Sequence, residues 1–232
     1  MNRPYVILHM LTSIDGKITG DFLSSEISDV YFEEYYRIHR EYASRAFACG
    51  RITMEGSFTQ GAKPDLSPFY RAKVAREDYV AKRHDFYAVS IDPHGRLGWS
   101  DSEIHDPDPG YDDAHIIEVL TAQASDEYVA FLKSKGISYI FCGEDEIDCA
   151  LMLKKLFNLF GIKKLMLEGG GLTDTLFFEE GLIDEISLVA VPMADSSDGI
   201  DLFANKKKGL LTFKNVTATP LANGGLWLNY KN

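Results

Sequence analysis

Short apolar runs alternate with segments of helical periodicity along most of this chain. The apolar runs are rich in β-branched and aromatic residues and predict buried strands at Tyr5 to Leu11, Phe86 to Ile91, Ile116 to Leu120, Ile137 to Cys142, Ile162 to Leu167 and Ile186 to Val191. Helices are predicted from about Asp29 to Ala48, from Ser125 to Gly136, from Asp148 to Phe160 and from Leu172 to Glu180. Strands that alternate with helices of about a dozen residues favour parallel pairing with right-handed crossover connections.

The C-terminal segment follows a different pattern. Two apolar runs, Leu210 to Thr219 and Leu226 to Tyr230, flank the turn sequence Ala222-Asn223-Gly224-Gly225, which predicts an antiparallel hairpin. No internal repeat or low-complexity linker interrupts the sequence. We therefore expect one α/β domain over residues 1–232, with a central mixed, mostly parallel sheet and a C-terminal antiparallel hairpin.

The composition and net charge of the chain limit the classes of partner that it can bind. The chain has 24 Lys and Arg against 35 Asp and Glu, which gives a formal net charge of −11. A surface of that sign repels phosphate backbones and anionic lipids, so we expect neither nucleic acid nor membrane partners. No apolar stretch reaches the roughly 18 residues of a membrane helix, and a cytoplasmic location is the default. The 3 cysteines form no CxxC pair and are expected to be buried and reduced.

The strongest local signal is the segment Glu168-Gly169-Gly170-Gly171-Leu172-Thr173. A predicted strand runs into three glycines and directly into a predicted helix. Glycines let a ligand approach the backbone, and the free amides of a helix start favour an anion such as phosphate. Thr173 adds a hydroxyl donor. The alternative is a tight turn between strand and helix, in which the glycines only relieve crowding.

A second signal ends the first predicted strand, where Thr12 is followed by Ser13-Ile14-Asp15-Gly16-Lys17. In open α/β sheets the carboxyl ends of the strands face the ligand crevice. Asp15 would then offer a carboxylate beside a substrate, and Lys17 an anion-binding cation. The alternative is an Asp-Gly turn with a solvated lysine.

A third signal is Gly50-Arg51-Ile52-Thr53, which follows the apolar stretch Ala46 to Cys49. An arginine beside a threonine hydroxyl at the end of a strand can hold a phosphate through charge-assisted hydrogen bonds. Alone, this signal is weak.

Other kinds of site are less well supported. The segment with His105, Asp106, Asp108, Asp112, Asp113 and His115 contains metal-capable side chains, but its prolines and loop character favour a solvated acidic loop, and we predict no metal site. No GxSxG elbow or triad-like histidine context is present, which leaves no basis for acyl-transfer chemistry.

Together the three motifs resemble the C-terminal reductase domain of bacterial riboflavin biosynthesis proteins. The order is Ser13-Ile14-Asp15-Gly16-Lys17, then Gly50-Arg51-Ile52-Thr53, Glu168-Gly169-Gly170-Gly171 and finally Gly181-Leu182-Ile183-Asp184-Glu185. The segment from Val89 through Asp92 to Leu97 supports the likeness, which covers nearly the whole chain. The Gly-Arg-x-Thr segment is also similar to that of dihydrofolate reductases, which share the fold.

The resemblance implies a three-layer dihydrofolate-reductase-like fold with helices on both faces of the sheet, NADPH as the hydride donor, a small-molecule substrate and a homodimer. Carried over by position, Asp15, Lys17 and Glu168 would form the catalytic group. The cofactor would be bound by Thr12, Gly50, Arg51, Thr53, Asp92, Gly169, Gly170, Gly171, Leu172 and Thr173, with Arg51 on the 2′-phosphate.

The sequence departs from the family pattern where the substrate is concerned. The family has Ala-Asp-Asp-Pro shortly after the threonine of the second motif, and this chain has Glu55-Gly56-Ser57-Phe58. The family's substrate-phosphate arginine near the end of the first helix falls on Glu41 by an ungapped count, beside Arg40. The resemblance implies an NADPH-dependent reductase similar to 5-amino-6-(5-phosphoribosylamino)uracil reductase. A dihydrofolate-reductase-like enzyme with another heterocyclic or carbonyl substrate and a non-catalytic nucleotide-binding protein remain the alternatives.

Overall fold

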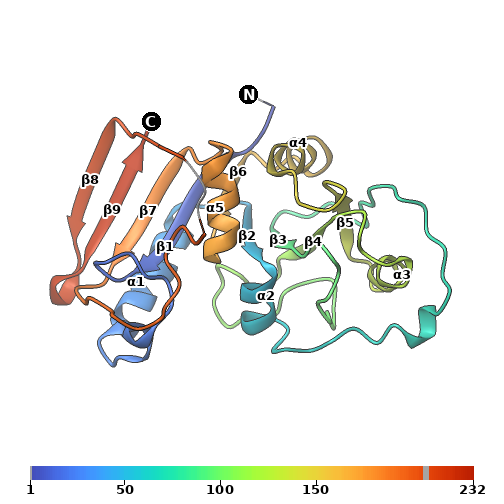
Figure 1. Cartoon of the computed structure of the whole chain (residues 1–232), viewed down its shortest axis with the longest axis horizontal. Coiled ribbons are helices and arrows are strands. Elements are labelled where there is room, and N and C mark those ends of the chain that lie inside the picture. Colours follow the sequence, from blue (N-terminus) through green and yellow to red (C-terminus); the bar gives the residue numbers. More distant parts are fainter. Residues whose placement is uncertain (1, 206–208) are drawn as a thin grey trace. The chain divides into compact units, whose positions relative to one another are not determined.

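The structure, a computed structural model, describes residues 2–205 and 209–232 and consists of two compact units (Figure 1). The first, called here the central unit, comprises Met1–Pro4 and Arg45–Leu165. The second, the terminal unit, comprises Tyr5–Ser44 and Met166–Asn232. Strand β6 (Lys164–Leu167) contains the third division point along the chain, after Leu165. The prediction of a single domain stays a prediction.

Four parallel strands form the sheet of the central unit, in the order β5-β4-β3-β2. They are β2 (Ala46–Gly50), β3 (Tyr87–Ile91), β4 (His115–Leu120) and β5 (Ser138–Phe141). Every residue of the first three is buried, as expected for parallel strands that are covered on both faces.

Three helices accompany these strands: α2 (Arg51–Ser57), α3 (Asp126–Ser134) and α4 (Cys149–Phe160), with the 3-10 turn η2 (Ser67–Phe69). The Ser125 side chain caps α3 by accepting the Tyr128 N–H, and Asp148 caps α4 in the same way. Helix α4 ends at Gly161, whose φ of 71° lies in the left-handed region that glycine tolerates.

The terminal unit combines parallel and antiparallel pairing. Strand β1 (Tyr5–Thr12) pairs in parallel with β7 (Glu185–Ala190), and β7 pairs antiparallel with β9 (Leu226–Lys231), which pairs with β8 (Asn215–Pro220). The helices are α1 (Ser28–Glu41) and α5 (Gly171–Glu179), with the 3-10 turns η1 (Asp21–Ser24) and η3 (Ala222–Gly224). Side chains of β1, η1, α1, β7 and the residue after β7 form one buried cluster of Leu11, Phe22, Tyr31, Ile38, Val189 and Val191.

Most predicted elements are confirmed, including the C-terminal hairpin and the buried, free cysteines. The helix predicted from Asp29 to Ala48 is wrong at its C-terminal end. Helix α1 stops at Glu41, Ala43 adopts a positive φ of 46°, and Ala46–Gly50 is a strand. The segment forms a strand because all five of its residues pair with β3 and are buried. This stabilisation outweighs its local helix propensity. Among the described residues, no helix is long and apolar enough to cross a bilayer.

The interior of the central unit contains two carboxyl groups, those of Asp92 and Glu118. Asp92 Oδ2 accepts the backbone N–H of Arg96 at 2.5 Å and of Leu97 at 3.0 Å, and Glu118 Oε1 accepts the indole N–H of Trp99. Burial raises the pKa of Glu118 well above its usual value, and the nearby charge of Asp92 raises it further. Burial also raises the pKa of Asp92.

The raised pKa of Glu118 gives a stability prediction. Because the folded-state pKa lies above the unfolded one, each pH unit above about 4.3 costs up to about 1.4 kcal/mol of folding free energy until the folded-state pKa is reached. Glu118→Gln is neutral at every pH and can still accept the Trp99 N–H. We expect the variant to gain stability over the wild type as the pH rises from 5 to 8, measured by urea denaturation. The exposed Glu144→Gln is the control and should show no such trend, and a constant difference for Glu118→Gln would contradict the assignment.

Candidate functional site

The loop after β1 is fixed by hydrogen bonds within the terminal unit. Ser13 N–H donates to the Lys17 carbonyl at 3.0 Å, and the Lys17 N–H returns to Ser13 Oγ at 2.9 Å. Ile14 N–H donates to Met193 O at 2.9 Å, which ties the loop to the segment after β7. Thr12 is buried at the end of β1, and its carbonyl accepts the Val191 N–H at 2.8 Å. The structure therefore places Thr12, Asp15 and Lys17 on one ordered turn.

Asp15 is a carboxylate at neutral pH. Its Oδ1 accepts the backbone N–H of Asp195 at 3.0 Å. This bond, with a second from Ser13, lowers the pKa of Asp15 below its usual value. The group can therefore stabilise positive charge, but it holds no proton to donate.

Lys17 is a cation with partners on the segment that follows β7. Its Nζ donates to Gly199 O at 3.0 Å and lies 2.8 Å from Asp201 Oδ1. The bond with Asp201 raises the pKa of Lys17. The side chain of Asp201 is largely exposed, so this ion pair is weak and an anionic ligand can compete for the lysine.

The glycine segment leads from β6 into α5. Gly169 has a φ of 108°, and Gly170, the N-cap of α5, has φ 73° and ψ 134°. A residue with a β-carbon is strained in such conformations. In the described part of the chain, no side chain caps the α5 N-terminus through a hydrogen bond. The first backbone amides of α5 therefore form a cradle whose chemistry fits a phosphate group.

Gly171 has a separate, structural reason to be glycine. A β-carbon there would lie 2.5 Å from Asp201 O and 2.8 Å from Ile200 Cγ2. Its carbonyl also accepts the Ala204 N–H at 3.2 Å. Close packing thus explains Gly171 without a ligand. Beyond it, Leu172 is exposed and Thr173 is buried.

Glu168 lies between β6 and these glycines and is almost completely buried. Its Oε1 lies 2.5 Å from Nδ1 of His39, a buried residue in the last turn of α1. A buried carboxyl group is costly unless a partner supplies a hydrogen bond, and His39 supplies one. His39 was not among the predicted site residues, because no local pattern reports a partner that is 129 residues away along the chain.

Arg51 begins α2 in the central unit, directly after Gly50, the last residue of β2. Its Nη1 lies 2.5 Å from Oε2 of Glu55, one helical turn later, and Lys63 also pairs with Glu55. Glu55 belongs to the segment that replaces the family's Ala-Asp-Asp-Pro. Thr53 is half-buried in the same helix. Arg51 is therefore positioned by a carboxylate with which a phosphate would have to compete.

Asp92, the remaining predicted cofactor residue, follows β3. It is fully buried, and its Oδ2 closes the turn that leads to Leu97 by accepting two backbone N–H groups. This geometry gives Asp92 a structural role in the turn, and a contact with the cofactor stays a prediction.

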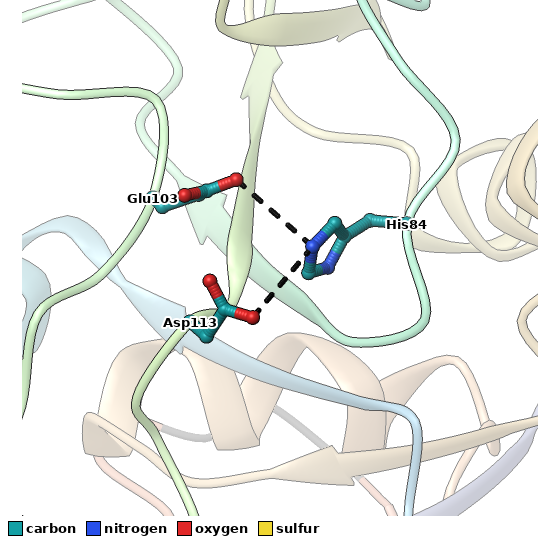
Figure 2. A group of neighbouring side chains, drawn as sticks. All are labelled: His84, Glu103 and Asp113. Atoms are coloured by element: carbon teal, nitrogen blue, oxygen red, sulfur yellow. Dashed lines mark ion pairs between the residues drawn. The ribbon is translucent and has the colours of Figure 1, made fainter.

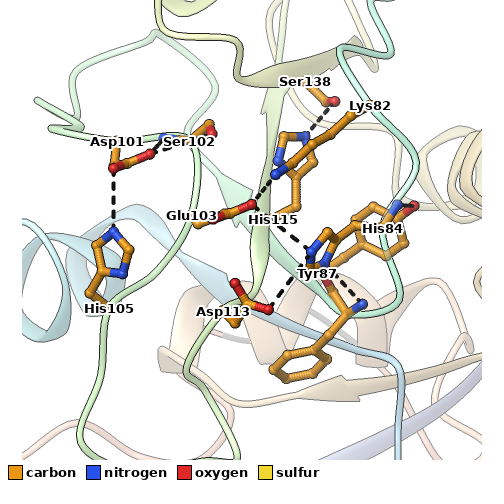
Figure 3. A network of polar contacts seen from close by, with 11 residues as sticks. Lys82, His84, Tyr87, Asp101, Ser102, Glu103, His105, Asp113, His115 and Ser138 are labelled. Carbon is orange, nitrogen blue, oxygen red and sulfur yellow. Dashed lines mark hydrogen bonds and ion pairs between the residues drawn. The ribbon is translucent and has the colours of Figure 1, made fainter.

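Metal-capable side chains do gather in the central unit, but as a set that the sequence did not predict. His84, Glu103 and Asp113 place one ligand atom each within 4.8 Å of one another (Figure 2). His84 Nε2 is 3.9 Å from each of the two carboxylates. The ammonium group of Lys82 already pairs with Glu103 (Figure 3). A lysine of this unit thus supplies the positive charge that a metal ion would bring.

The metal-capable residues of the predicted loop have other partners. His115 is buried, and its Nε2 lies 2.8 Å from Ser138 Oγ. Burial, with the charges of Lys82 and His84, lowers the pKa of His115 to about 4. His105 contacts Asp101 at 3.3 Å (Figure 3). Asp106, Asp108 and Asp112 each accept a backbone N–H of the loop itself. The absence of a metal site remains a prediction.

The sequence of this chain is similar to those of known reductases. Residues 110–197 match the family model described as the RibD C-terminal domain. The matched segment includes Glu168, the glycines and α5. The chain is 29% identical over 191 residues to the 2,5-diamino-6-ribosylamino-4(3H)-pyrimidinone 5′-phosphate reductase of Methanothermobacter thermautotrophicus, covering 82% of this chain and 79% of that protein. It is 24% identical over 212 residues to the reductase of the same name from Aquifex aeolicus, covering 86% and 82%. The predicted resemblance is confirmed.

Solved structures agree on the fold. A pyrimidine reductase-like protein from Corynebacterium diphtheriae superposes with a TM-score of 0.67 at 16% identity, covering 99% of this chain and 92% of that one. The riboflavin biosynthesis reductase Rib7 of Saccharomyces cerevisiae superposes with a TM-score of 0.64 at 13% identity, covering 100% and 90%. The predicted α/β fold with a mixed sheet is confirmed.

The glycine cradle yields a binding prediction. Gly170→Val should cost about 1–2 kcal/mol in backbone strain and should also obstruct the approach of a phosphate to the α5 amides. Gly161→Val is the matched control, because Gly161 has nearly the same φ of 71°, has open space around it and ends α4. We expect both variants to lose stability, Gly170→Val more because its ψ of 134° lies outside the left-handed region in which Gly161 has ψ 19°, and only Gly170→Val to lose at least tenfold in affinity for a nicotinamide nucleotide, measured by calorimetry. Equal affinities would leave the glycine a purely structural role.

Proposed function

We propose that this protein is an NADPH-dependent reductase that acts on 2,5-diamino-6-ribosylamino-4(3H)-pyrimidinone 5′-phosphate or a close relative of it. The observation that carries the proposal is the junction of β6 and α5. There a buried carboxyl group, Glu168, directly precedes two glycines with positive φ and a helix start that no described side chain caps. An anion cradle beside a buried ionisable group is what a nicotinamide reductase needs for cofactor phosphate and substrate.

In this proposal the cofactor contacts are assigned residue by residue from the family resemblance. The α5 amides, with Gly169, Gly170 and Thr173, would hold the phosphates, and Arg51 would hold the 2′-phosphate that distinguishes NADPH from NADH. Further contacts with the cofactor would come from Gly50, Thr53 and Thr12. A bound nicotinamide supplies the hydride with its electron pair.

Reduction of a ribosylamino group at its sugar carbon needs one hydride and one proton. Asp15 is ionised at neutral pH, so we assign it and Lys17 to electrostatic binding of the substrate. Glu168 shares a hydrogen at 2.5 Å with a neighbouring imidazole, so we assign it to the handling of the proton, which water then replaces.

A second candidate is a reductase of the same fold with a different small heterocyclic or carbonyl substrate. It is favoured by Glu55, whose carboxylate stands where the family has Ala-Asp-Asp-Pro and pairs with Arg51 and Lys63. Glu41, at the position of the family's substrate-phosphate arginine, pairs with Arg37 at 2.7 Å and carries the wrong charge for a phosphate. A homodimer and a cytoplasmic location stay predictions within this proposal.

The role of Arg51 can be tested by cofactor discrimination. Arg51→Ala should weaken NADPH binding by about 10- to 100-fold, the loss expected for charged hydrogen bonds to phosphate, and should leave NADH binding nearly unchanged. The matched control is Arg37→Ala on α1, because Arg37 forms the same i,i+4 pair with a glutamate. Binding is measured by fluorescence titration at fixed salt. Equal losses for the two cofactors would remove Arg51 from the 2′-phosphate.

For Glu55, the partner of Arg51, we predict the opposite effect on NADPH affinity. Glu55→Gln removes the charge that competes with phosphate for Arg51 and should tighten NADPH binding severalfold without a matching effect on NADH. Weaker NADPH binding would mean that Glu55 positions Arg51 for the phosphate. Turnover with the pyrimidinone phosphate, followed by NADPH absorbance, tests the reaction itself.

A further inference from the structure

A line of buried and half-buried polar groups runs through the terminal unit and leads to Glu168. It begins at Trp227 on β9, continues through Ser187 on β7 and His9 on β1, and reaches α1 at Tyr35. His9 and Ser187 are completely buried. Buried polar side chains persist only when they are satisfied by hydrogen bonds, so each member of the line constrains the next.

Chemistry determines the direction of the hydrogen bonds at the two ends of this line. The Trp227 indole can only donate, and it donates to Ser187 Oγ at 2.9 Å. Tyr35 O can only accept, so His9 Nε2, 3.0 Å away, carries a hydrogen. Burial lowers the pKa of His9, which keeps its ring neutral. In the neutral ring, His9 Nδ1 has a lone pair that can accept the Ser187 hydroxyl at 3.1 Å, and the same nitrogen lies 3.3 Å from the Ser187 carbonyl oxygen.

The line ends on the turn of α1 that carries His39. In an α-helix the carbonyl of residue i accepts the N–H of residue i+4, so Tyr35 O is also the acceptor for the His39 backbone. The ring of Tyr35 stacks on that of His9, with centroids 4.3 Å apart and planes 9° apart. His9 thus fixes α1 at Tyr35, and the placement of this turn determines where the His39 imidazole lies.

From these contacts we infer that His39 is a positioning residue for Glu168: it holds the carboxyl group in place and shares its proton, and the Trp227–Ser187–His9 line holds His39. This inference rests on the proposed function, because it names the group through which Glu168 acts in reduction. His9 is excluded as the proton partner, since its ring is neutral and both of its nitrogens are engaged.

Tyr42 and Glu185 are the titratable groups beside the line, and Tyr42 also hydrogen-bonds to Ser187. The Tyr42 ring lies 6.2 Å from that of His9, and its hydroxyl donates to Glu185 at 2.5 Å. Burial raises the pKa of Tyr42, so its hydroxyl stays neutral. Glu185 also accepts from Tyr5 and Asn229 and lies 3.3 Å from Lys231 Nζ. Within this unit, the proton equilibrium nearest Glu168 is therefore that of His39.

The first test is independent of catalysis. Ring nitrogens of the 6 histidines are followed by NMR as a function of pH, with the His39 signals assigned from their loss in His39→Asn. Glu168→Gln should lower the pH at which the His39 ring takes up its proton by about one unit or more, because a carboxylate within hydrogen-bond distance favours the charged imidazole. An unchanged His39 titration would overturn the inference, whether or not the protein reduces the pyrimidinone.

The second test uses turnover. His39→Asn keeps a neutral donor near the Nδ1 position and cannot titrate, so we expect kcat to fall at least tenfold, with the affinity for NADPH within about twofold of the wild type. The limb of the kcat/KM profile that reports the pair should disappear. A normal kcat and pH profile in a folded His39→Asn protein would overturn the positioning role.

A third variant tests the line at its far end and does not alter His39. Trp227→Phe removes the first donor and should lower kcat severalfold without changing the NADPH affinity. Tyr31→Phe is the matched control, because its hydroxyl donates to Ala222 O in the same unit and not to a group of the line. Equal effects of the two substitutions would show that only general stability is involved. If the wild type fails to reduce the pyrimidinone while the His39–Glu168 coupling is present, the proposed substrate is wrong. The positioning role of His39 then still stands.

Discussion

Parallel pairing of β1 with β7 is the constraint on which the chemistry of the terminal unit depends. The register from Ile7 opposite Glu185 to Thr12 opposite Ala190 makes both strands end at the same edge. The loops that follow must therefore share hydrogen-bonding groups, and they do so where Asp195 donates to Asp15 and Asp201 pairs with Lys17. A shift of one residue would turn every side chain of β1 to the other face and separate these partners.

The same pairing determines the interior of the unit. His9 faces Ser187 across the β1–β7 ladder, and β9 brings Trp227 to the other side of Ser187. Three strands and one helix are thereby linked through polar atoms inside an otherwise apolar core. Such a network is favourable only when each donor has one acceptor, which explains why the hydroxyl of Ser187 and the two nitrogens of His9 are all engaged.

The carboxyl groups of the two units lie in different environments, which favour different protonation states. In the central unit, Glu118 lies deep in the sheet, where burial favours its neutral form. In the terminal unit, Asp15 lies near solvent and accepts a backbone N–H, which favours its ionised form. Glu168 is buried but has an imidazole at 2.5 Å. Only this third environment provides both a proton and a partner that can exchange it, which is why the proposed mechanism assigns the proton to Glu168.

Local sequence signals were sufficient for most of the fold. The turn Asn223-Gly224 and its flanking apolar runs predicted the hairpin, and Ser125, Asp148 and Gly161 marked helix ends, because caps and turns depend on neighbouring residues alone. The same signals misplaced the end of α1. Ala46–Gly50 becomes a strand only through its pairing with β3, a contact between segments about 40 residues apart that periodicity does not report.

The functional site, like the fold, was only partly predictable from the sequence. Glycines at positions 169 and 170 were identifiable from sequence because a positive φ selects glycine locally. The sequence by itself thus determined the α/β class, the glycine cradle and the motifs that carry the family resemblance. The partner of Glu168 was not identifiable, since His39 is 129 residues away along the chain. Only the tertiary structure decided that His39 meets Glu168, that Glu55 pairs with Arg51 and that Gly171 serves packing, because each depends on where folding brings a side chain and not on which residue precedes or follows it.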